Sequence, residues 1–171
     1  MSFPVPPEQT AWFALTVKPR HEKAAAKNLS ARGLEPFVPL YTVRRRWSDR
    51  TKEVQVSLFP GYVFCRFGYE HRLDVLNLPS VTSIVGFGNA PAPIPDSEID
   101  AIRSIVDSGR PYGPWPFLKV GQQVRIEQGA LAGIKGILLR EKDSWRVVVS
   151  VELLQRSVAV EIDRAMISPV L

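Results

Sequence analysis

The stretch LFPGYVFCRF, at residues 58–67, decides the fold of this chain of 171 residues. Its Pro-Gly pair breaks an extended pattern, and the aromatic and β-branched residues that follow predict a strand. Because side chains alternate along a strand, Tyr62 and Phe64 share one face, and Val63 and Cys65 share the other. Both faces are apolar and need a cover, either helices on both sides or helices on one side and a partner protein on the other.

Outward from this stretch, the pattern predicts an α+β fold. A buried strand over 12–17 is followed by a helix between Pro19 and Gly33. Residues 34–59 predict a long hairpin with a basic tip, and a second amphipathic helix is predicted within 91–109. These helix positions fit an antiparallel sheet that is flanked by helices.

A proline-rich stretch, RPYGPWPF at 110–117, predicts a stiff linker. Beyond it, short β-branched runs separated by turns predict a small SH3-like β-barrel. The predicted organisation is a loose leader (1–10), an N-terminal domain (11–109), a Pro-rich linker (110–118) and a β-barrel domain (119–171).

The composition is that of a folded protein, with 45% hydrophobic and 23% charged residues and a net charge of +5. No apolar run is long enough for a membrane span, and the start of the chain lacks the pattern of a secretory signal. A single cysteine permits no internal disulfide. We therefore expect a cytoplasmic, monomeric protein with no membrane partner.

Motifs of catalysis are missing from the sequence. The two histidines, His21 and His71, lack partners at metal-ligand spacing. No serine stands in a nucleophile elbow, and Cys65 lies in an apolar strand, where a packed thiol is expected rather than a nucleophile. The sequence predicts no catalytic residue, no metal and no cofactor, and the protein is expected not to be an enzyme.

Positive charge is densest over 18–52, which has 10 basic and 3 acidic residues. One cluster lies on the predicted hairpin and consists of Arg44, Arg45, Arg46, Arg50 and Lys52. It is interpreted either as a contact for phosphates or an acidic protein, or as a solvated hairpin that protects a sheet edge. A second cluster lies where a strand meets a helix N-terminus, a place that favours phosphate, although ordinary helix solvation is the alternative. Its members are Lys18, Arg20, His21 and Lys23.

Four segments, in this order, resemble the NusG family of transcription elongation factors. They are WFALTVKPRHEKAAAKNL, LFPGYVFCRF, LPSVTSIVGFG and VGQQVRIEQGALAGIKGIL. The first three are similar to the family's N-terminal (NGN) domain, and the last is similar to its KOW domain. The F-P-x-Y-x-F run and the long basic hairpin are also similar to RfaH, which favours a specialised paralog over the housekeeping factor.

The resemblance implies a function. Family N-terminal domains bind the clamp helices of bacterial RNA polymerase through an apolar depression, keep the clamp closed and suppress pausing or termination. The residues that match this depression are Trp12, Thr16, Phe59, Pro60, Gly61 and Tyr62, and the hypothesis requires Phe59 and Tyr62 to be partly exposed. The basic face of these domains lies near upstream and non-template DNA, and Lys18, Arg20, His21 and Lys23 match it.

The KOW domain of the family binds a small-subunit ribosomal protein or the termination factor Rho. The matching loop positions are Gly129, Leu131, Gly133 and Ile134. The alternative hypothesis is a KOW-type ribosomal or RNA-binding protein that acts without polymerase and binds structured RNA through its basic faces.

Overall fold

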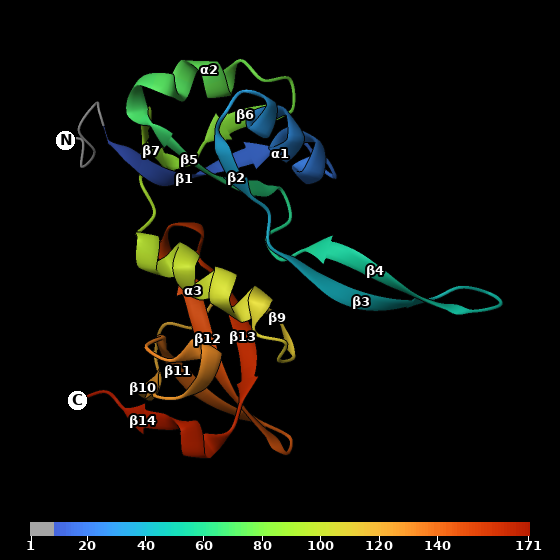
Figure 1. Ribbon diagram of the computed structural model, residues 1–171, viewed down its shortest axis with the longest axis vertical. Helices are drawn as coiled ribbons and strands as arrows, with labels where there is room; N and C mark the ends of the chain where they lie inside the picture. The colour runs from blue at the N-terminus through green and yellow to red at the C-terminus, as the bar shows by residue number, and fades with distance from the viewer. Residues whose placement is uncertain (1–8) are drawn as a thin grey trace. The chain divides into compact units, whose positions relative to one another are not determined.

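The computed structural model describes residues 9–171, so most of the predicted leader over 1–10 lies outside the described residues (Figure 1). The chain divides into two compact units. The N-terminal unit runs to Val38 and continues from Phe59 to Asp96, and the C-terminal unit comprises Pro39–Leu58 and Ser97–Leu171. These bounds differ from the predicted domains, because the hairpin and the second long helix group with the C-terminal unit.

The N-terminal unit is built on a four-stranded sheet in the order β2-β5-β1-β6, in which every neighbouring pair is antiparallel. Its strands are β1 (Thr10–Val17), β2 (Glu35–Phe37), β5 (Tyr62–Gly68) and β6 (Val81–Ile84). Its helices are α1 (Glu22–Ala31), the short helix η1 (Tyr69–His71) and α2 (Arg72–Leu76), and a small hairpin is formed by β7 (Gly86–Phe87) and β8 (Ala90–Pro91).

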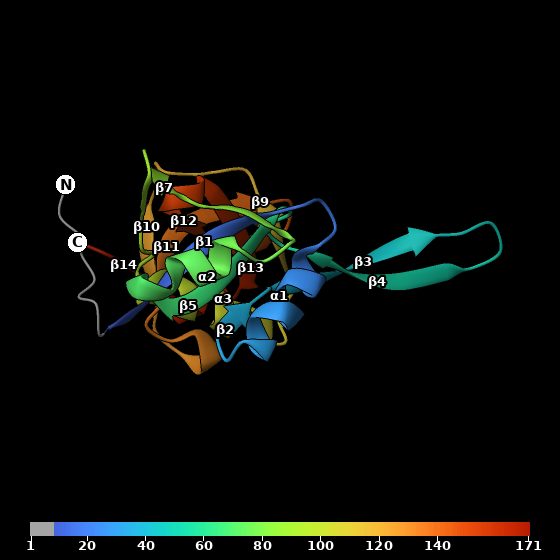
Figure 2. The same ribbon diagram turned by 90° about the horizontal axis from the view of Figure 1, so that it is seen from above.

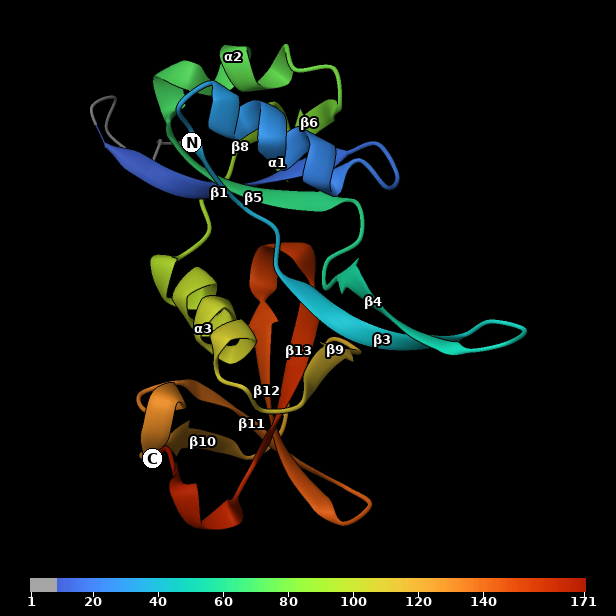
Figure 3. The same cartoon turned by 45° about the vertical axis from the view of Figure 1, so that its right-hand side comes forward.

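Helices α1 and α2 cover one face of this sheet, as Figures 1 and 3 show. Phe13 of β1 stacks on Phe67 of β5, with ring centroids 4.7 Å apart. Ala25 and Leu29 of α1 are fully buried against this layer, and the small alanine lets the helix lie close to the strands. Gly33, at φ +77°, follows the end of α1, where glycine is favoured. Helices α1 and α2 thus cover the core on this face of the sheet.

The C-terminal unit contains a hairpin, a helix and a six-stranded antiparallel sheet in the order β14-β10-β11-β12-β13-β9. The hairpin consists of β3 (Leu40–Arg46) and β4 (Thr51–Ser57), and α3 spans Asp96–Asp107. The sheet strands are β9 (Tyr112–Trp115), β10 (Gln123–Ile126), β11 (Lys135–Glu141), β12 (Ser144–Val151), β13 (Arg156–Ile162) and β14 (Ile167–Pro169). Two residues join β11 to β12, and the helices η2 (Gly129–Leu131), η3 (Glu152–Leu154) and η4 (Arg164–Met166) lie in the other connections after β10.

The predicted linker over 110–118 is in part a strand. Residues 112–115 form β9, which pairs with β13 so that Pro114 faces Val158. Proline is tolerated there because β9 is at the edge of its sheet and its missing N–H interrupts no interior ladder. The α+β class, the helix-flanked antiparallel sheet and the second, SH3-like β domain are as predicted.

Candidate functional site

The segment Phe59–Tyr62, predicted to contact polymerase, forms a tight turn. The Tyr62 amide donates a hydrogen bond to the Phe59 carbonyl (3.0 Å), and Gly61 has φ +85°. Proline at the second position and a positive φ at the third define a type II turn, in which glycine is the favoured third residue. The Pro-Gly pair of F-P-G-Y therefore supplies the residues that a type II turn favours.

Two further hydrogen bonds hold this turn in place. The Gly61 amide donates to Oε2 of Glu22 at 2.8 Å, and its carbonyl accepts from the Val17 amide at 2.9 Å. The first residue of α1 and the last residue of β1 therefore fix the position of the turn. Glu22 is not among the site residues that the sequence predicts, because its partner is 39 residues away and no local pattern signals the contact.

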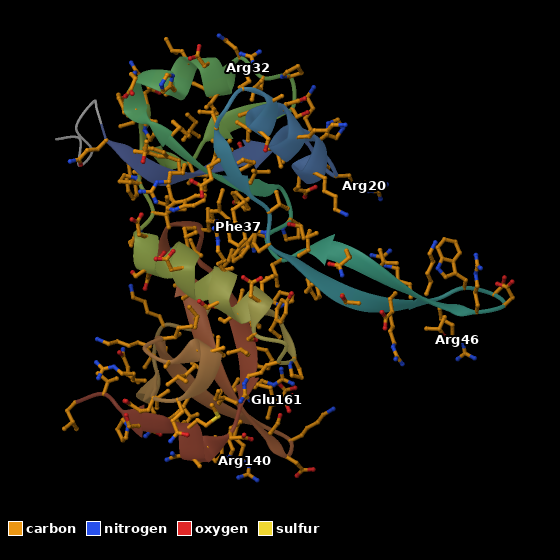
Figure 4. All side chains as sticks on the ribbon, in the orientation of Figure 1. Arg20, Arg32, Phe37, Arg46, Arg140 and Glu161 are labelled. Carbon is orange, nitrogen blue, oxygen red and sulfur yellow. The ribbon has the colours of Figure 1, made fainter. Side chains whose placement is uncertain are left out.

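Behind the turn lies a cluster of aromatic rings on the sheet face opposite α1. Strand register places Trp12 and Phe64 on this face, and Phe37 of β2 faces Phe64. Ring centroids are 6.4 Å apart for Trp12 and Phe37, 6.2 Å for Phe37 and Phe64, and 5.2 Å for Phe59 and Phe64. Figure 4 labels Phe37. The predicted apolar second face exists, and it is largely aromatic.

The exposure of these residues differs from the expectation in one respect. The prediction that Phe59 is partly exposed is wrong: its ring packs edge-on against Phe64 and is 1% exposed, and Trp12 is 3% exposed. Tyr62 and Thr16 are half-buried and Pro60 is exposed. The accessible part of the predicted site therefore consists of Thr16, Pro60, Gly61 and Tyr62, and the buried rings of Trp12 and Phe59 lie beneath it.

Thr16 is oriented by β6. Its hydroxyl hydrogen-bonds the hydroxyl of Thr82 at 2.7 Å and also contacts the hydroxyl of Ser83. These three hydroxyl groups border the aromatic cluster where β1 and β6 pair. They give the edge of the apolar face a polar, hydrogen-bonding rim.

The predicted basic junction also forms a type II turn. The His21 amide donates to the Lys18 carbonyl (3.0 Å), Pro19 is second, and Arg20 is third with φ +65°. A non-glycine residue in this region is unusual and costs about 1 kcal/mol. Figure 4 shows Arg20 at this turn, before α1.

The structure brings the four junction residues together at the N-terminus of α1, and all four are exposed. His21 immediately precedes α1, and its ring Nδ1 lies 3.3 Å from the hydroxyl of Ser80. The partial positive charge of the helix N-terminus lies beside the positive charges of Lys18, Arg20 and Lys23. The structure brings the four residues together, and their binding of an anion stays a prediction.

The three hairpin arginines do not form one patch. Arg44 and Arg46 project on one face of the ribbon, and Arg45 on the other, because neighbouring residues of a strand alternate. Arg44 is paired with Glu53 at 3.9 Å. Figure 4 shows Arg46 near the end of the hairpin.

The predicted partner-binding loop of the C-terminal unit joins β10 to β11. Gly129 and Gly133 have φ values of +81° and +92°, which glycine adopts without strain. Leu131 is 1% exposed, so the prediction that it offers an apolar contact is wrong; it packs inward from η2 as part of the core. Ile134 is half-buried and keeps some accessible surface.

A cleft of about 730 Å³ lies between α3 and strands β11 and β12, and Gly133 and Ile134 are among its lining residues. Figure 3 shows α3 beside these strands. Glu98 of α3 also lines the cleft, and burial raises the pKa of its carboxyl group. The loop predicted to bind a partner thus borders a hollow, partly apolar surface.

The structure offers no arrangement for catalysis at the one cysteine. Burial, reinforced by the carboxylate of Glu35, raises the pKa of the Cys65 thiol to about 12. A thiol with that pKa is protonated and unreactive near neutral pH. Among residues 9–171, no three His, Cys, Asp or Glu side chains gather as ligands for a metal ion.

Comparison with known proteins agrees with this architecture. A family model described as "Transcription termination factor nusG" matches residues 10–103. The transcription termination/antitermination protein NusG of Lactococcus lactis is 32% identical over 146 residues, which cover 83% of this chain and 78% of the relative. NusG of Pseudomonas aeruginosa is 28% identical over 175 residues, which cover 93% of this chain and 98% of the relative.

A solved structure that describes a domain interaction in Thermotoga maritima NusG has the same fold. It matches with a TM-score of 0.60 and 21% sequence identity, covering 97% of this chain and 100% of that chain. This similarity concerns the fold alone.

The chain thus combines a four-stranded antiparallel sheet covered by helices with a second unit that contains a six-stranded antiparallel sheet. The chain belongs to the NusG family of transcription termination/antitermination factors. The predicted family is therefore confirmed, and because these relatives are transcription factors and not enzymes, so is the prediction that the chain is not an enzyme. Within the part of the chain that the structure describes, no helix is long and apolar enough to cross a membrane.

Proposed function

We propose that this chain binds the clamp helices of bacterial RNA polymerase and suppresses pausing or termination during elongation. The observation that carries the proposal is the F-P-G-Y turn, fixed by Glu22 and Val17 at the margin of the aromatic face. Thr16, Pro60 and Tyr62 would make the contact, and the buried rings of Trp12 and Phe59 would hold them in position. A rigid turn loses little conformational entropy when it binds.

The mechanism is a shift in population. A ligand that binds the closed polymerase clamp more tightly than the open one favours closure by the difference in binding free energy. No bond is made or broken. The junction of Lys18, Arg20, His21 and Lys23 would contact upstream or non-template DNA, where its charge and the N-terminus of α1 favour phosphate.

The C-terminal unit would recruit a second partner, either a small-subunit ribosomal protein or Rho. Gly129 and Gly133 shape the loop, and Ile134 supplies apolar surface at the margin of the cleft. Leu131 would act only by filling the core beneath the loop. The interpretation of the chain as an operon-specific, RfaH-like paralog stays a prediction.

The test is a pull-down of core RNA polymerase with the wild-type chain and with Tyr62→Asp. We expect the substitution to abolish binding, because it places a charge on the accessible part of the apolar face. Leu73→Asp is the control, since Leu73 is 60% exposed on α2, away from that face. Retained binding by a folded Tyr62→Asp variant would reject the proposed surface.

The second candidate, an RNA-binding protein that acts without polymerase, is favoured by the exposed cations of the junction and the hairpin. It predicts RNA binding in the absence of polymerase, with an affinity that falls steeply as salt rises. A folded wild-type chain that fails to bind polymerase would favour it.

A further inference from the structure

The two faces of the β3–β4 ribbon differ in how their charges are balanced. The pairs of directly opposed residues run without a bulge from Leu40 and Ser57 to Arg46 and Thr51. Opposed residues share a face, and successive pairs alternate between the faces. Figures 1 and 2 show the hairpin extending away from the six-stranded sheet of the C-terminal unit.

One face contains two complementary cross-strand pairs, and we call it the paired face. Beyond the first pair, Leu40 and Ser57, its members are Thr42, Gln55, Arg44, Glu53, Arg46 and Thr51. Gln55 donates a hydrogen bond to the Thr42 hydroxyl at 2.8 Å, and the next pair on this face is the ion pair of Arg44 and Glu53. The arrangement is the expected one for a solvated ribbon.

The other face has no such balance. Arg45 and Lys52 stand directly opposite each other, an arrangement of like charges that destabilises a ribbon. The Trp47 amide donates to the Arg50 carbonyl at 2.7 Å, which continues the ladder by one more pair on this same side. We call Arg45, Lys52, Trp47 and Arg50 the cationic face.

Trp47 is the unusual member of this group. Its side chain is 57% exposed at the end of the hairpin, although indole is among the side chains that gain most from burial. The hairpin itself has two acidic residues, Asp49 in the turn and Glu53, which lies on the other face and pairs with Arg44. Folding of the ribbon accounts for neither the exposed indole nor the opposed cations.

An unpaired nucleic-acid strand accounts for both. Cations that contact phosphates, combined with an aromatic ring on which a base stacks, are the means by which proteins bind single strands. We propose that the cationic face binds a nucleic acid strand, with Trp47 stacked on an unpaired base and Arg45, Arg50 and Lys52 contacting phosphates. The site goes beyond the proposed polymerase contact, which lies on the N-terminal unit.

The proposal sets the cationic face apart from the rest of the predicted cluster. Arg44 and Arg46 lie on the paired face and would contribute only through long-range charge. Their neighbour Arg45 would make a direct contact. Because the three arginines are adjacent in sequence and all exposed, they provide matched variants with the same change of charge.

The experiment uses the full chain and fluorescence anisotropy of labelled oligonucleotides. Single-stranded DNA, single-stranded RNA of the same sequence and the corresponding DNA duplex are compared, which distinguishes the two sources of an unpaired base. We expect Trp47→Ala to weaken single-strand binding about tenfold and duplex binding much less. Trp47→Phe should restore most of the affinity, because it keeps a stacking ring.

The arginine variants supply the second measurement. Arg45→Gln should weaken single-strand binding. It should also reduce the slope of log affinity against log salt by about 1, the change expected for the loss of one phosphate contact. Arg44→Gln should have a smaller effect on both. Circular dichroism checks that each variant is folded, and polymerase pull-down should be unaffected by Trp47→Ala, which separates this proposal from the clamp-binding one.

Three outcomes would overturn the proposal. Equal losses for Arg45→Gln and Arg44→Gln would show a non-directional charge effect rather than a face. Equal losses of single-strand and duplex affinity with Trp47→Ala would reject stacking on an unpaired base. Binding to polyglutamate but to no oligonucleotide would assign the cationic face to an acidic protein partner.

Discussion

Two turns of the N-terminal unit share a proline and a hydrogen bond but differ at the residue that must adopt a positive φ. Phe59–Tyr62 has Gly61 at φ +85°, and Lys18–His21 has Arg20 at φ +65°. Glycine occupies this region without steric cost, whereas a side chain costs about 1 kcal/mol or more. One turn is relaxed, and the other is strained.

The comparison shows which of the two turns has a strained backbone. The relaxed turn is anchored by the buried Phe59 ring and by Glu22, and its role is to hold the edge of an apolar face in position. The strained turn has a guanidinium group where glycine would be more stable, next to the N-terminus of α1. Strained backbone is often found at functional positions, and Arg20 fits a role in binding anions.

Removing the anchor of the relaxed turn should have the largest effect. Phe59→Ala deletes a ring that is 1% exposed and packed on Phe64, and we expect it to lower the free energy of unfolding by about 3–5 kcal/mol. Urea denaturation of the variant and of the wild type measures the loss. Pro60→Ala, at an exposed position, serves as the control, and a loss below about 1 kcal/mol for Phe59→Ala would contradict the buried anchor.

The hydrogen bond from Gly61 to Glu22 should have the next largest effect. Glu22→Ala removes the carboxylate that accepts this amide proton at 2.8 Å, and we expect a loss of about 1.5 kcal/mol. Hydrogen exchange of the Gly61 amide should accelerate at the same time. Lys27→Ala, an exposed position on the same helix, should change neither quantity; unchanged exchange in Glu22→Ala would mean that the carboxylate does not hold the turn.

Gly61→Ala tests the conformational demand itself. A Cβ at this position meets no atom within 4 Å, so steric crowding adds nothing and only the positive φ opposes the substitution. We expect a destabilisation of about 1 kcal/mol in urea denaturation. Gly113→Ala is the matched control, because its Cβ also enters open space and its φ is not positive, and equal effects at both glycines would show that the turn is not restrictive.

The sequence predicted those features that follow from local patterns. Alternation located the two-sided strand at Tyr62, and proline and glycine marked the turns and the end of α1 at Gly33. Contacts between residues far apart in the sequence could not be predicted from such patterns. No local pattern signals that Glu22 reaches Gly61 or that β9 joins a sheet despite Pro114. Nor does one signal the register that sets Arg45 opposite Lys52.

The same limit explains the two errors in exposure. The family resemblance assigns Phe59 and Leu131 to binding surfaces because they match contact positions of the family, but both side chains are 1% exposed in this chain. A single sequence shows that a residue is apolar, and it does not show whether the fold or a partner covers it.

Replacing the strained residue of the second turn should have the smallest effect and the opposite sign. Arg20→Gly relieves the cost of φ +65° but adds the backbone entropy of glycine to the unfolded chain, so we expect a net stabilisation of only about 0.5 kcal/mol. Arg20→Ala removes the same charge and leaves the strain. Both variants should weaken oligonucleotide binding equally, and only Arg20→Gly should be more stable than the wild type in urea. If the two variants unfold at the same urea concentration, the arginine is not strained, and the contrast between the turns lies only in their charge.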